Sequence, residues 1–398
     1  MRILIATWNR NLVGGVERYL KVVLPGLLAR GHQVGLVYER PVDLERETID
    51  PPQAPLAKWG LAELGLESVV RAVEEWKPHV VYSHGLETVE LEDVLLRTCP
   101  TVLFAHNYYG TCGTGNKYHR FPQVLPCGRR FGPMCLLLHY PRRCGGLDPW
   151  KALRVYRRQA QRNARLADYR AVVVASAHMY REFLKHGVAP EKIHLVPLPA
   201  ADSASQATPP APRAPRGRIL LIGRLTNLKG GHYLIQALPR AAGKLGPLTL
   251  TIAGDGPERQ NLQDLAHRFH LSVEFVGWVP THNAEKLMRQ ADLLAVPSLW
   301  PEPFGQVGVE GGRLGVPAVG YAVGGIPDWL IPGRSGELAP GDPPTVQGLA
   351  EAIVRVLADP SHYSSLCRGA WELASRFTLD AHLAELELIL GAEDPGRS

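Results

Sequence analysis

The feature that most constrains the fold of this chain is a repeated alternation between short apolar runs and longer segments with helical periodicity. In the first half, the runs that predict buried strands lie at 2–6, 33–38, 79–83, 101–105 and 171–176. Helical patterns at 16–30 and 62–76 separate the first three of these runs. Strands and helices that alternate in this way are typical of parallel βαβ units, so the first half predicts a doubly wound parallel sheet.

The same alternation begins again after a segment rich in Pro, Ala and Ser at 200–217, which we interpret as a linker. The second set of predicted strands lies at 218–222, 248–253, 273–276, 293–296 and 318–321. A length of 398 residues fits two domains of about 150–200 residues each. The sequence therefore predicts an α/β fold with two facing Rossmann-like domains and an interdomain cleft, where ligands commonly bind.

The predicted domain boundaries follow from this pattern. Residues 1–199 form the N-terminal domain, with an insertion rich in Cys and Arg at 107–147. Residues 218–375 form the C-terminal domain after the linker. We expect a final helix within 376–398 to pack back on the N-terminal domain.

The composition excludes several classes of protein. A content of 45% hydrophobic and 21% charged residues is typical of a globular protein and disfavours a disordered or fibrous chain. No apolar run approaches the ~20 residues needed to span a bilayer. The apolar stretch at 3–6 is too short for the core of a signal peptide. We therefore expect a cytoplasmic protein whose six cysteines stay reduced.

Positive charge is concentrated in one part of the first half. Residues 106–170 contain 13 lysines and arginines but only two acidic residues, which suggests an anionic partner. Within 151–165 the cations recur every three to four residues, a spacing that predicts a cationic helical face. Nucleic acid is disfavoured because no recognised binding module accompanies the charge. We favour an anionic membrane surface, with the protein peripheral at the inner face of the plasma membrane.

Two carboxylates in the second half carry the strongest chemical signal. Glu302 and Glu310 stand eight residues apart, after the strand at 293–296 and across a Pro-Phe-Gly turn. A helix beginning near 306 would offset them by roughly 10 Å. Its first N–H groups would suit an anion or sugar oxygens, and the carboxylates would suit hydroxyl groups. This arrangement predicts a site for a polyhydroxylated ligand.

Cations and glycines at the ends of two other strands predict contacts with phosphate. Arg224 and Lys229 follow the strand at 218–222 within a glycine-rich segment and could clamp a diphosphate. Gly14 and Gly15 follow the first strand and would let backbone approach a phosphate. The chain has neither a Gly-x-Gly-x-x-Gly fingerprint nor a Walker-type motif, which disfavours a dehydrogenase and a P-loop ATPase.

Taken together, these motifs resemble the retaining glycosyltransferases of family 4, which have the GT-B architecture. The resemblance covers nearly the whole chain and rests on Gly14-Gly15-Val16-Glu17-Arg18, His106-Asn107, Gly223-Arg224-Leu225 with Lys229-Gly230, Gly254-Asp255-Gly256-Pro257, Phe275-Val276-Gly277, the Glu302-x7-Glu310 pair, Gly315-Val316-Pro317 and Gly324-Gly325. The Glu pair together with the Arg-Lys clamp is its most specific part.

The resemblance implies a role for each matching residue. Arg224 and Lys229 would hold the donor diphosphate, and Glu302 would contact the transferred sugar. The remaining implied contacts are the backbone of Phe304 and Gly305 with sugar oxygens, Glu310 with the ribose, Gly14 and Gly15 with phosphate, and His106 with the sugar from the N-terminal, acceptor-side domain.

The resemblance also implies an activity, which is hexose transfer from a nucleotide-sugar, most readily a UDP- or GDP-sugar, to a glycan or lipid-linked acceptor. The product would be a cell-surface polysaccharide or glycolipid. No cofactor or metal is needed for catalysis, because the two cations can stabilise the leaving diphosphate. Three alternatives stay open: a nucleotide-sugar epimerase, a sugar phosphorylase, and a non-catalytic protein that binds anionic polymers.

Four of the six cysteines lie in the insertion, at Cys112, Cys127, Cys135 and Cys144. A long loop with few helix or strand signals is hard to order by packing alone, and four thiolates on one Zn²⁺ would order it. The spacing lacks the Cys-x2-Cys pattern of zinc knuckles, so disulfides and unliganded thiols stay open as alternatives. The sequence therefore suggests a structural zinc site.

Overall fold

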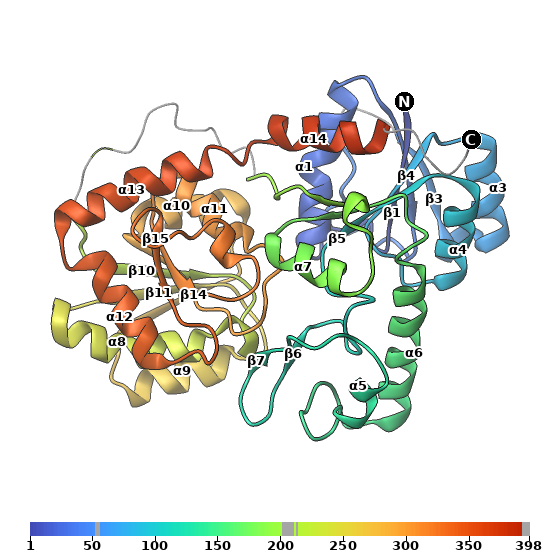
Figure 1. Ribbon diagram of the computed structural model, residues 1–398. Coiled ribbons are helices and arrows are strands. Elements are labelled where there is room, and N and C mark those ends of the chain that lie inside the picture. Colours follow the sequence, from blue (N-terminus) through green and yellow to red (C-terminus); the bar gives the residue numbers. More distant parts are fainter. Residues whose placement is uncertain (52–55, 201–210, 212–213, 392–398) are drawn as a thin grey trace. The chain divides into compact units, whose positions relative to one another are not determined.

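In a computed structural model, residues 1–51, 56–200, 211 and 214–391 are described. The chain divides into two compact units (Figure 1). Unit 1 contains Met1–Lys117, Gly128–Leu198 and the C-terminal segment from Leu379. Unit 2 contains Tyr118–Cys127 and Pro199–Thr378. Most of the predicted linker at 200–217 lies outside the described residues.

Unit 1 is built on a seven-stranded parallel sheet in the order β3-β2-β1-β4-β5-β8-β9. The strands are β1 (Arg2–Thr7), β2 (Gln33–Tyr38), β3 (Ala57–Gly60), β4 (Val80–Ser83), β5 (Thr101–Ala105), β8 (Ala171–Val174) and β9 (Ile193–Leu195). The order reverses direction between β1 and β4. In doubly wound sheets this switch point is where ligands gather at the carboxyl ends of the strands.

The helices of unit 1 cover both faces of this sheet (Figure 1). They are α1 (Gly15–Ala29), α2 (Leu61–Leu64), α3 (Leu66–Trp76), α4 (Val89–Thr98), α5 (Met134–Leu137), α6 (Pro149–Arg165), α7 (Ala177–Lys185) and α14 (Leu379–Gly391). The predicted helix at 62–76 is split in two, because Gly65 between α2 and α3 has φ +75°. A fully buried apolar cluster joins β1, β2 and β4 to α3 and α4.

The last helix, α14, belongs to unit 1 although unit 2 precedes it in the chain. Its His382 Nε2 lies 2.8 Å from the hydroxyl of Tyr19 in α1, and its Nδ1 lies 2.8 Å from the carbonyl of Pro197. Leu383 packs so closely on Gly26 that a Cβ there would approach it within 2.5 Å. These contacts fix the C-terminal helix on α1.

Unit 2 repeats the design with a six-stranded parallel sheet in the order β12-β11-β10-β13-β14-β15. Its strands are β10 (Arg218–Ile222), β11 (Thr249–Ala253), β12 (Val273–Gly277), β13 (Leu293–Val296), β14 (Ala318–Tyr321) and β15 (Gly336–Ala339). Its helices are α8 (Gly231–Leu245), α9 (Arg259–Arg268), α10 (Thr281–Gln290), α11 (Gln306–Arg313), α12 (Val346–Leu357) and α13 (Pro360–Ala374). A small antiparallel pair, β6 (Tyr118–His119) and β7 (Leu125–Pro126), also clusters with unit 2.

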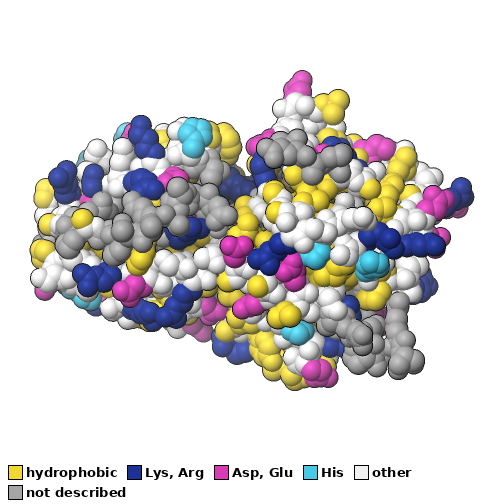
Figure 2. Space-filling view, turned by 90° about the horizontal axis from the view of Figure 1, so that it is seen from above, with side chains coloured by type: hydrophobic (Ala, Val, Ile, Leu, Met, Phe, Trp, Pro, Cys, Tyr) yellow, Lys and Arg dark blue, Asp and Glu magenta, His cyan; other side chains and the backbone are white. Residues whose placement is uncertain are grey.

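The two parallel sheets confirm the predicted fold class. The prediction omitted the strands β3, β9 and β15, and it placed no helix at α4, α7, α9, α10 or α13. Three of these are strands of three or four residues at or next to a sheet edge, too short for their apolar pattern to stand out. Within the described residues, no helix is both long and apolar enough to cross a bilayer. On the face that Figure 2 draws, basic, acidic and hydrophobic side chains are interspersed.

Candidate functional site

At the carboxyl edge of the unit 2 sheet, backbone hydrogen bonds hold together the glycine-containing loops that follow neighbouring strands. The N–H of Gly223, after β10, donates to the carbonyl of Ala253 at the end of β11 (2.9 Å). The N–H of Gly254 in turn donates to the carbonyl of Gly277 at the end of β12 (2.6 Å). The loops that follow three neighbouring strands are therefore bonded to one another at this edge.

Glycine is required at two points of this edge. Gly230, just before α8, has φ +69°, and a Cβ on it would lie 1.8 Å from the carbonyl oxygen of Pro297, after β13. Gly254 has φ +139°, and a Cβ on it would lie 1.9 Å from the carbonyl oxygen of Gly223. A side chain at either position would force backbone segments apart, because the clashing atoms belong to the main chain.

The central contact of the site is an ion pair between Lys229 and Glu302. Lys229 Nζ lies 2.5 Å from Glu302 Oε1. The hydroxyl of Ser298 and the indole N–H of Trp300 donate to the same oxygen, at 2.6 and 3.0 Å. Glu302 is only 5% exposed, and burial of a carboxylate is tolerated because charged and polar donors surround it. The structure thus pairs Glu302, the carboxylate that we predict to contact the sugar, with Lys229, one of the two cations that we predict to bind the diphosphate.

The turn that carries Glu302 is fixed by a second glycine loop. Gly325 N–H donates to the carbonyl of Glu302 (2.7 Å). A Cβ on Gly324 would lie within 2.3–2.4 Å of the backbone oxygen and nitrogen of Glu302. The Gly324-Gly325 pair after β14 therefore allows the close approach that positions this carboxylate.

The start of α11 has the geometry that the sequence predicts. Gly305 caps the helix in the left-handed conformation, with φ +86°. Trp329 stabilises this turn. Its indole N–H donates to the carbonyl of Phe304 (2.6 Å), and its ring lies against Gly305 and Gly308. The Phe304 side chain is buried, so this residue can offer a ligand only its backbone.

The other two predicted residues of unit 2 lie on the same loops. Arg224 lies in the loop after β10, where its side chain is exposed. Glu310 lies within α11, four residues after its first residue, and is half-buried. Unit 2 therefore contributes Arg224, Lys229, Glu302, Phe304, Gly305 and Glu310 from two loops and one helix at the carboxyl edge of one sheet.

Unit 1 places Gly14 and Gly15 at the N-terminus of α1, after β1. Glu17 is buried, and its Oε2 accepts from the N–H of Gly14 (2.8 Å). A Cβ on Gly15 would find open space, with no atom within 4 Å. The helix start is accessible at Gly15, whereas the Gly14 amide is already bonded to a carboxylate of its own helix.

His106 follows β5 and lies in a compact cluster of rings. Its Nε2 lies 2.8 Å from Nδ1 of His84, and its ring stacks on Phe104 with 4.5 Å between centroids. Tyr19 lies 5.2 Å from His106 by ring centroids and hydrogen-bonds Tyr82 at 2.6 Å. Burial among these rings lowers the pKa of His106 to about 3, so the imidazole is neutral near pH 7. It can exchange hydrogen bonds with a ligand but carries no positive charge.

The predicted zinc site of the insertion stays a prediction. Its four cysteines all lie in described residues. Those residues contain no group of three or more His, Cys, Asp or Glu placed to hold a metal ion. Cys127 clusters with unit 2, whereas Cys112, Cys135 and Cys144 cluster with unit 1.

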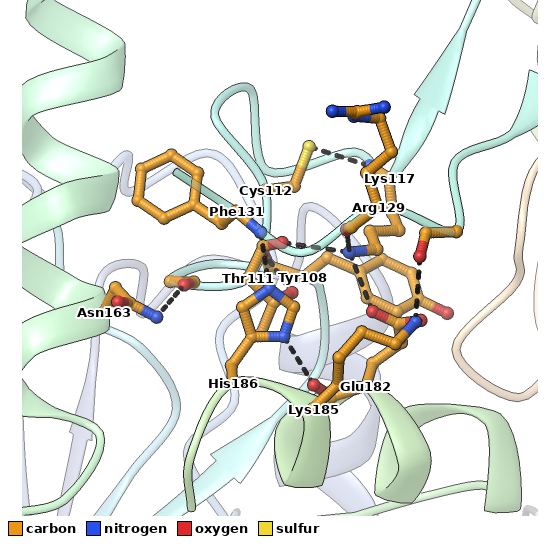
Figure 3. A network of polar contacts seen from close by, with 12 residues as sticks. Tyr108, Thr111, Cys112, Lys117, Arg129, Phe131, Asn163, Glu182, Lys185 and His186 are labelled. Carbon is orange, nitrogen blue, oxygen red and sulfur yellow. Dashed lines mark hydrogen bonds and ion pairs between the residues drawn. The ribbon is translucent and has the colours of Figure 1, made fainter. Parts of the chain in front are cut away.

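A buried ion pair holds part of the insertion (Figure 3). Lys117 is 1% exposed, and its Nζ lies 2.7 Å from Glu182 Oε2 in α7. The same ammonium donates to the carbonyls of Thr111 (3.1 Å) and Arg129 (2.7 Å). One buried lysine therefore links two stretches of the insertion, at Thr111 and at Arg129, to α7.

A buried histidine adds to this network. His186 Nδ1 lies 2.6 Å from the carbonyl of Glu182, and His186 Nε2 accepts from the N–H of Phe131 (2.9 Å). The donor must therefore be Nδ1–H, which defines a neutral tautomer. Burial lowers the pKa of His186, in agreement with that neutral form.

The predicted cationic face of α6 is narrower than its sequence suggests. Arg162 is buried, donates to the carbonyl of Leu86 (2.5 Å) and lies over the Tyr109 ring. Arg165 pairs with Asp93 in α4. The exposed arginines are Arg154, Arg157 and Arg158, on the first part of the helix. Arg158 and Arg162 lie on the same side of the helix, but only the later part of α6 packs on Leu86 and Tyr109, which buries Arg162.

Sequence reasoning missed the residues that support the predicted ones. Ser298 and Trp300 bond Glu302, and Trp329 bonds Phe304. Their only sequence signal is that Ser298 and Trp300 lie in the same strand-to-helix turn as Glu302. Trp329 lies beyond β14, and no local pattern connects it with the site.

Comparison with known proteins agrees with this geometry. The family model described as "Glycosyl transferases group 1" matches residues 208–370, and the one described as "Glycosyltransferase Family 4" matches residues 13–200. The chain resembles Anabaena HepE, solved in complex with UDP and glucose, with a TM-score of 0.68, 21% identity, and coverage of 98% of this chain and 99% of that one.

Two curated relatives match parts of the chain. A Mycobacterium tuberculosis glycogen synthase is 36% identical over 185 residues, which is 44% of either chain. A Corynebacterium urealyticum D-inositol 3-phosphate glycosyltransferase is 30% identical over 166 residues, covering 39% of this chain and 38% of the relative. The matches thus span less than half the length of these relatives. The first half of the chain thus matches a model of family 4 glycosyltransferases, the second half matches a model of group 1 glycosyl transferases, and the fold is of the GT-B type.

Proposed function

We propose that the protein transfers a hexose from a nucleotide-sugar, with retention at the anomeric carbon, to a glycan or lipid-linked acceptor in the synthesis of a cell-surface polysaccharide or glycolipid. The observation that carries this proposal is the Lys229–Glu302 pair at the carboxyl edge of the unit 2 sheet, beside the Arg224 loop. The solved structures of HepE contain UDP, UDP and glucose, or UDP-glucose, which favours a UDP-sugar over a GDP-sugar as the first donor to test.

In this proposal the donor diphosphate draws Lys229 away from Glu302. Diphosphate carries more negative charge than a carboxylate, so the mobile ammonium gains by binding it. Ser298 and Trp300 still donate to Glu302 after the exchange, so the buried carboxylate keeps two partners. Glu302 is then held in place to accept hydrogen bonds from hydroxyl groups of the hexose.

The remaining residues complete the proposed donor site. Arg224 binds the diphosphate through its planar fork, and Glu310 binds the ribose hydroxyls. The backbone of Phe304 and Gly305 meets the oxygens of the sugar. From unit 1, Gly14 and Gly15 approach the phosphates, and the neutral His106 contacts the sugar.

The chemistry of the proposed step is mainly electrostatic. When the anomeric C–O bond breaks, the sugar becomes oxocarbenium-like and its electron pair leaves with the diphosphate. Arg224 and Lys229 stabilise that added charge more in the transition state than in the ground state. The departing phosphate oxygen takes the proton of the acceptor hydroxyl, whose oxygen then bonds the anomeric carbon. This scheme needs neither a protein nucleophile nor a catalytic metal, and it runs at the inner face of the plasma membrane.

Donor binding is tested first by thermal shift with UDP, GDP, ADP and dTDP and their sugars. We expect one nucleotide class to raise the unfolding midpoint, because a ligand that binds only the folded state stabilises it. With that donor, hydrolysis and transfer are then followed by product analysis. An isomer of the donor formed without acceptor would indicate an epimerase, and a sugar phosphate formed from a glycan and phosphate would indicate a phosphorylase.

Two variants test the central pair. Lys229→Ala and Glu302→Gln should each slow donor hydrolysis about 100-fold, the usual cost of losing one preorganised charged contact. Lys244→Ala and Glu372→Gln are matched controls, because both side chains are exposed on helices of the same unit. Full activity of Lys229→Ala or Glu302→Gln would refute the proposal, and inactivity of the unaltered protein with every donor would favour the non-catalytic alternative.

A further inference from the structure

The tip of unit 1 carries hydrophobic side chains that its own fold does not bury. Large apolar residues are exposed on α5 and in the segment that leads to α6. The most exposed are Leu147 (80%), Trp150 (76%) and Leu137 (70%), and the others are Met134, Leu136 and Tyr140. Six such residues within 134–150 make an apolar tip, which is the name that we use for them. Exposed apolar patches bordered by polar residues usually mark a binding surface.

The apolar tip is attached to a well-anchored base. Phe131, just before it, packs on Tyr156 of α6 with 5.0 Å between ring centroids, and its N–H donates to buried His186. The carbonyl of Arg129 accepts from buried Lys117. Figure 3 shows these groups converging on α7. The exposed apolar side chains therefore extend from a segment that is bonded to the body of unit 1.

Positive charge borders the apolar tip. Arg154, Arg157 and Arg158 follow Trp150 along α6 and are exposed, and Lys151 and Arg130 are exposed beside it. The only acidic residue within 128–158 is Asp148, whose carboxylate accepts from the backbone N–H groups of Trp150 and Lys151 as a helix cap. Exposed cations therefore flank the apolar tip along the sequence, and Trp150 lies beside three of them in the groove described next.

Trp150 and these three arginines also line a groove of about 610 Å³ between α6 and the start of α4. Two acidic residues, Glu87 and Glu90, line the opposite wall, and Glu87 pairs with Arg40 (3.1 Å). An exposed tryptophan ring beside guanidinium groups is suited to the interface between lipid tails and headgroups, where amphipathic rings and basic side chains accumulate.

From these observations we infer that the apolar tip inserts into an anionic lipid bilayer, with Leu137, Leu147 and Trp150 in the acyl boundary and Arg154, Arg157 and Arg158 against the lipid phosphates. This inference names the residues that would bind the membrane partner of the proposed function. It rests on the proposed function only in taking the acceptor to be lipid-linked. An apolar centre within a basic border combines the two attractions that hold peripheral proteins on membranes. A nucleic acid would use the arginines but would give leucine side chains no burial.

The experiment measures binding to vesicles of phosphatidylcholine alone or mixed with phosphatidylglycerol. We expect the unaltered protein to bind the mixed vesicles and to release as salt concentration rises. The triple variant Leu137→Ser/Leu147→Ser/Trp150→Ser should bind them about tenfold more weakly, because apolar burial is lost while the charge is kept. The variant Arg157→Glu/Arg158→Glu should lose binding to a similar or greater extent.

Insertion has its own readout. Brominated lipid tails should quench the fluorescence of the unaltered protein, and the difference should disappear in Trp150→Phe. Leu388→Ser, an equally exposed leucine on α14 of the same unit, is the control and should bind as the unaltered protein does. Because all the altered side chains are exposed, the unfolding midpoints should stay the same, which excludes misfolding as the cause.

Three results would overturn the inference: unchanged vesicle binding by the triple variant, absence of quenching from Trp150, or equal loss of binding in Leu388→Ser. Binding to heparin or DNA without quenching by lipid would point to a soluble polyanion instead and would also overturn it. Hydrolysis of a water-soluble donor separates this inference from the proposed function. Hydrolysis without vesicle binding refutes only the membrane insertion, and vesicle binding without hydrolysis refutes only the transferase.

Discussion

The carboxyl edge of unit 2 and the insertion of unit 1 are organised by opposite means. At the edge, glycine-rich loops bond to one another within a few residues of the strands that carry them, as Gly223, Gly254 and Gly277 do. In the insertion, Lys117 reaches Glu182, which lies 65 positions later in the sequence. The comparison teaches that the first region can be recognised from local sequence, whereas the second depends on a contact that only folding creates.

The largest expected effect would show how far the insertion depends on its buried pair. Lys117→Met or Glu182→Leu alone should destabilise unit 1 by about 3–5 kcal/mol, because each removes one partner of a buried ion pair. Glu182 would then keep only the more exposed Lys185, and Lys117 would keep only carbonyl groups. The double variant should recover much of that loss. Denaturant unfolding followed by a probe in unit 1 measures it.

The control for that prediction is Lys185→Met, which removes the more exposed partner of Glu182. Lys185 Nζ lies 2.6 Å from Glu182 Oε1, but its side chain is 37% exposed. We expect a cost below about 1 kcal/mol. Equal costs for Lys117→Met and Lys185→Met would contradict the central place of the buried lysine.

The next largest effect concerns pH, because acid should lower the stability of unit 1 more than that of unit 2. Burial lowers the pKa of His84, His186 and His194 in unit 1, and it lowers the pKa of His106 to about 3 and of His178 and His382 to about 4. In unit 2, burial lowers the pKa of His232. Such groups favour the neutral form in the fold, so the stability that they give is complete above their unfolded pKa of about 6.5 and falls as pH decreases toward the folded values. Unit 1 should therefore unfold before unit 2 between about pH 6 and pH 4.

Each of these histidines should contribute a slope of up to about 1.4 kcal/mol per pH unit in that range. Calorimetry across the range measures it, with limited proteolysis to show which unit opens. His178→Phe removes one titrating ring beside Tyr108 and should flatten the slope by about one proton. If the two units lost stability in parallel, the contrast between them would fail.

A smaller effect tests the support of the central carboxylate. Ser298→Ala should slow donor hydrolysis about tenfold, because it removes one of two donors that would stay on Glu302 once Lys229 binds phosphate. Ser365→Ala, on α13 with a bond only to the carbonyl of His362, should leave the rate unchanged. An unchanged rate in Ser298→Ala would mean that the remaining partners, among them Trp300, position Glu302 without Ser298.

The smallest expected effect concerns metal. Since the described residues contain no group of three or more His, Cys, Asp or Glu placed to hold a metal ion, we expect prolonged chelation to leave the unfolding midpoint of the protein unchanged. Metal analysis of the purified protein before and after treatment is the accompanying measurement. If chelation removed a stoichiometric amount of zinc and lowered the unfolding midpoint, a metal would help to order the insertion. Lys117 would then not order it alone.

Much of the candidate site could be predicted because its residues follow strands that the sequence marks clearly. Lys229 and Glu302 come just after apolar runs, and parallel strands bring their carboxyl ends to one edge. The partners Ser298, Trp300 and Trp329 could not be predicted from a pattern, because a hydrogen bond between side chains depends on packing in three dimensions. The same limit explains why Arg162 was expected on the cationic face although it is buried.

By itself, the sequence determined the two parallel sheets and the places at which Arg224, Lys229 and the paired glutamates follow the strands of the second sheet. Periodicity indicates which side of each element is buried, and that information is local. Only the tertiary structure decided that Lys229 pairs with Glu302, that Lys117 of the insertion pairs with Glu182, and that leucines and a tryptophan are exposed on and after α5. Those outcomes depend on contacts between distant residues, whose free energy no single segment of the chain contains.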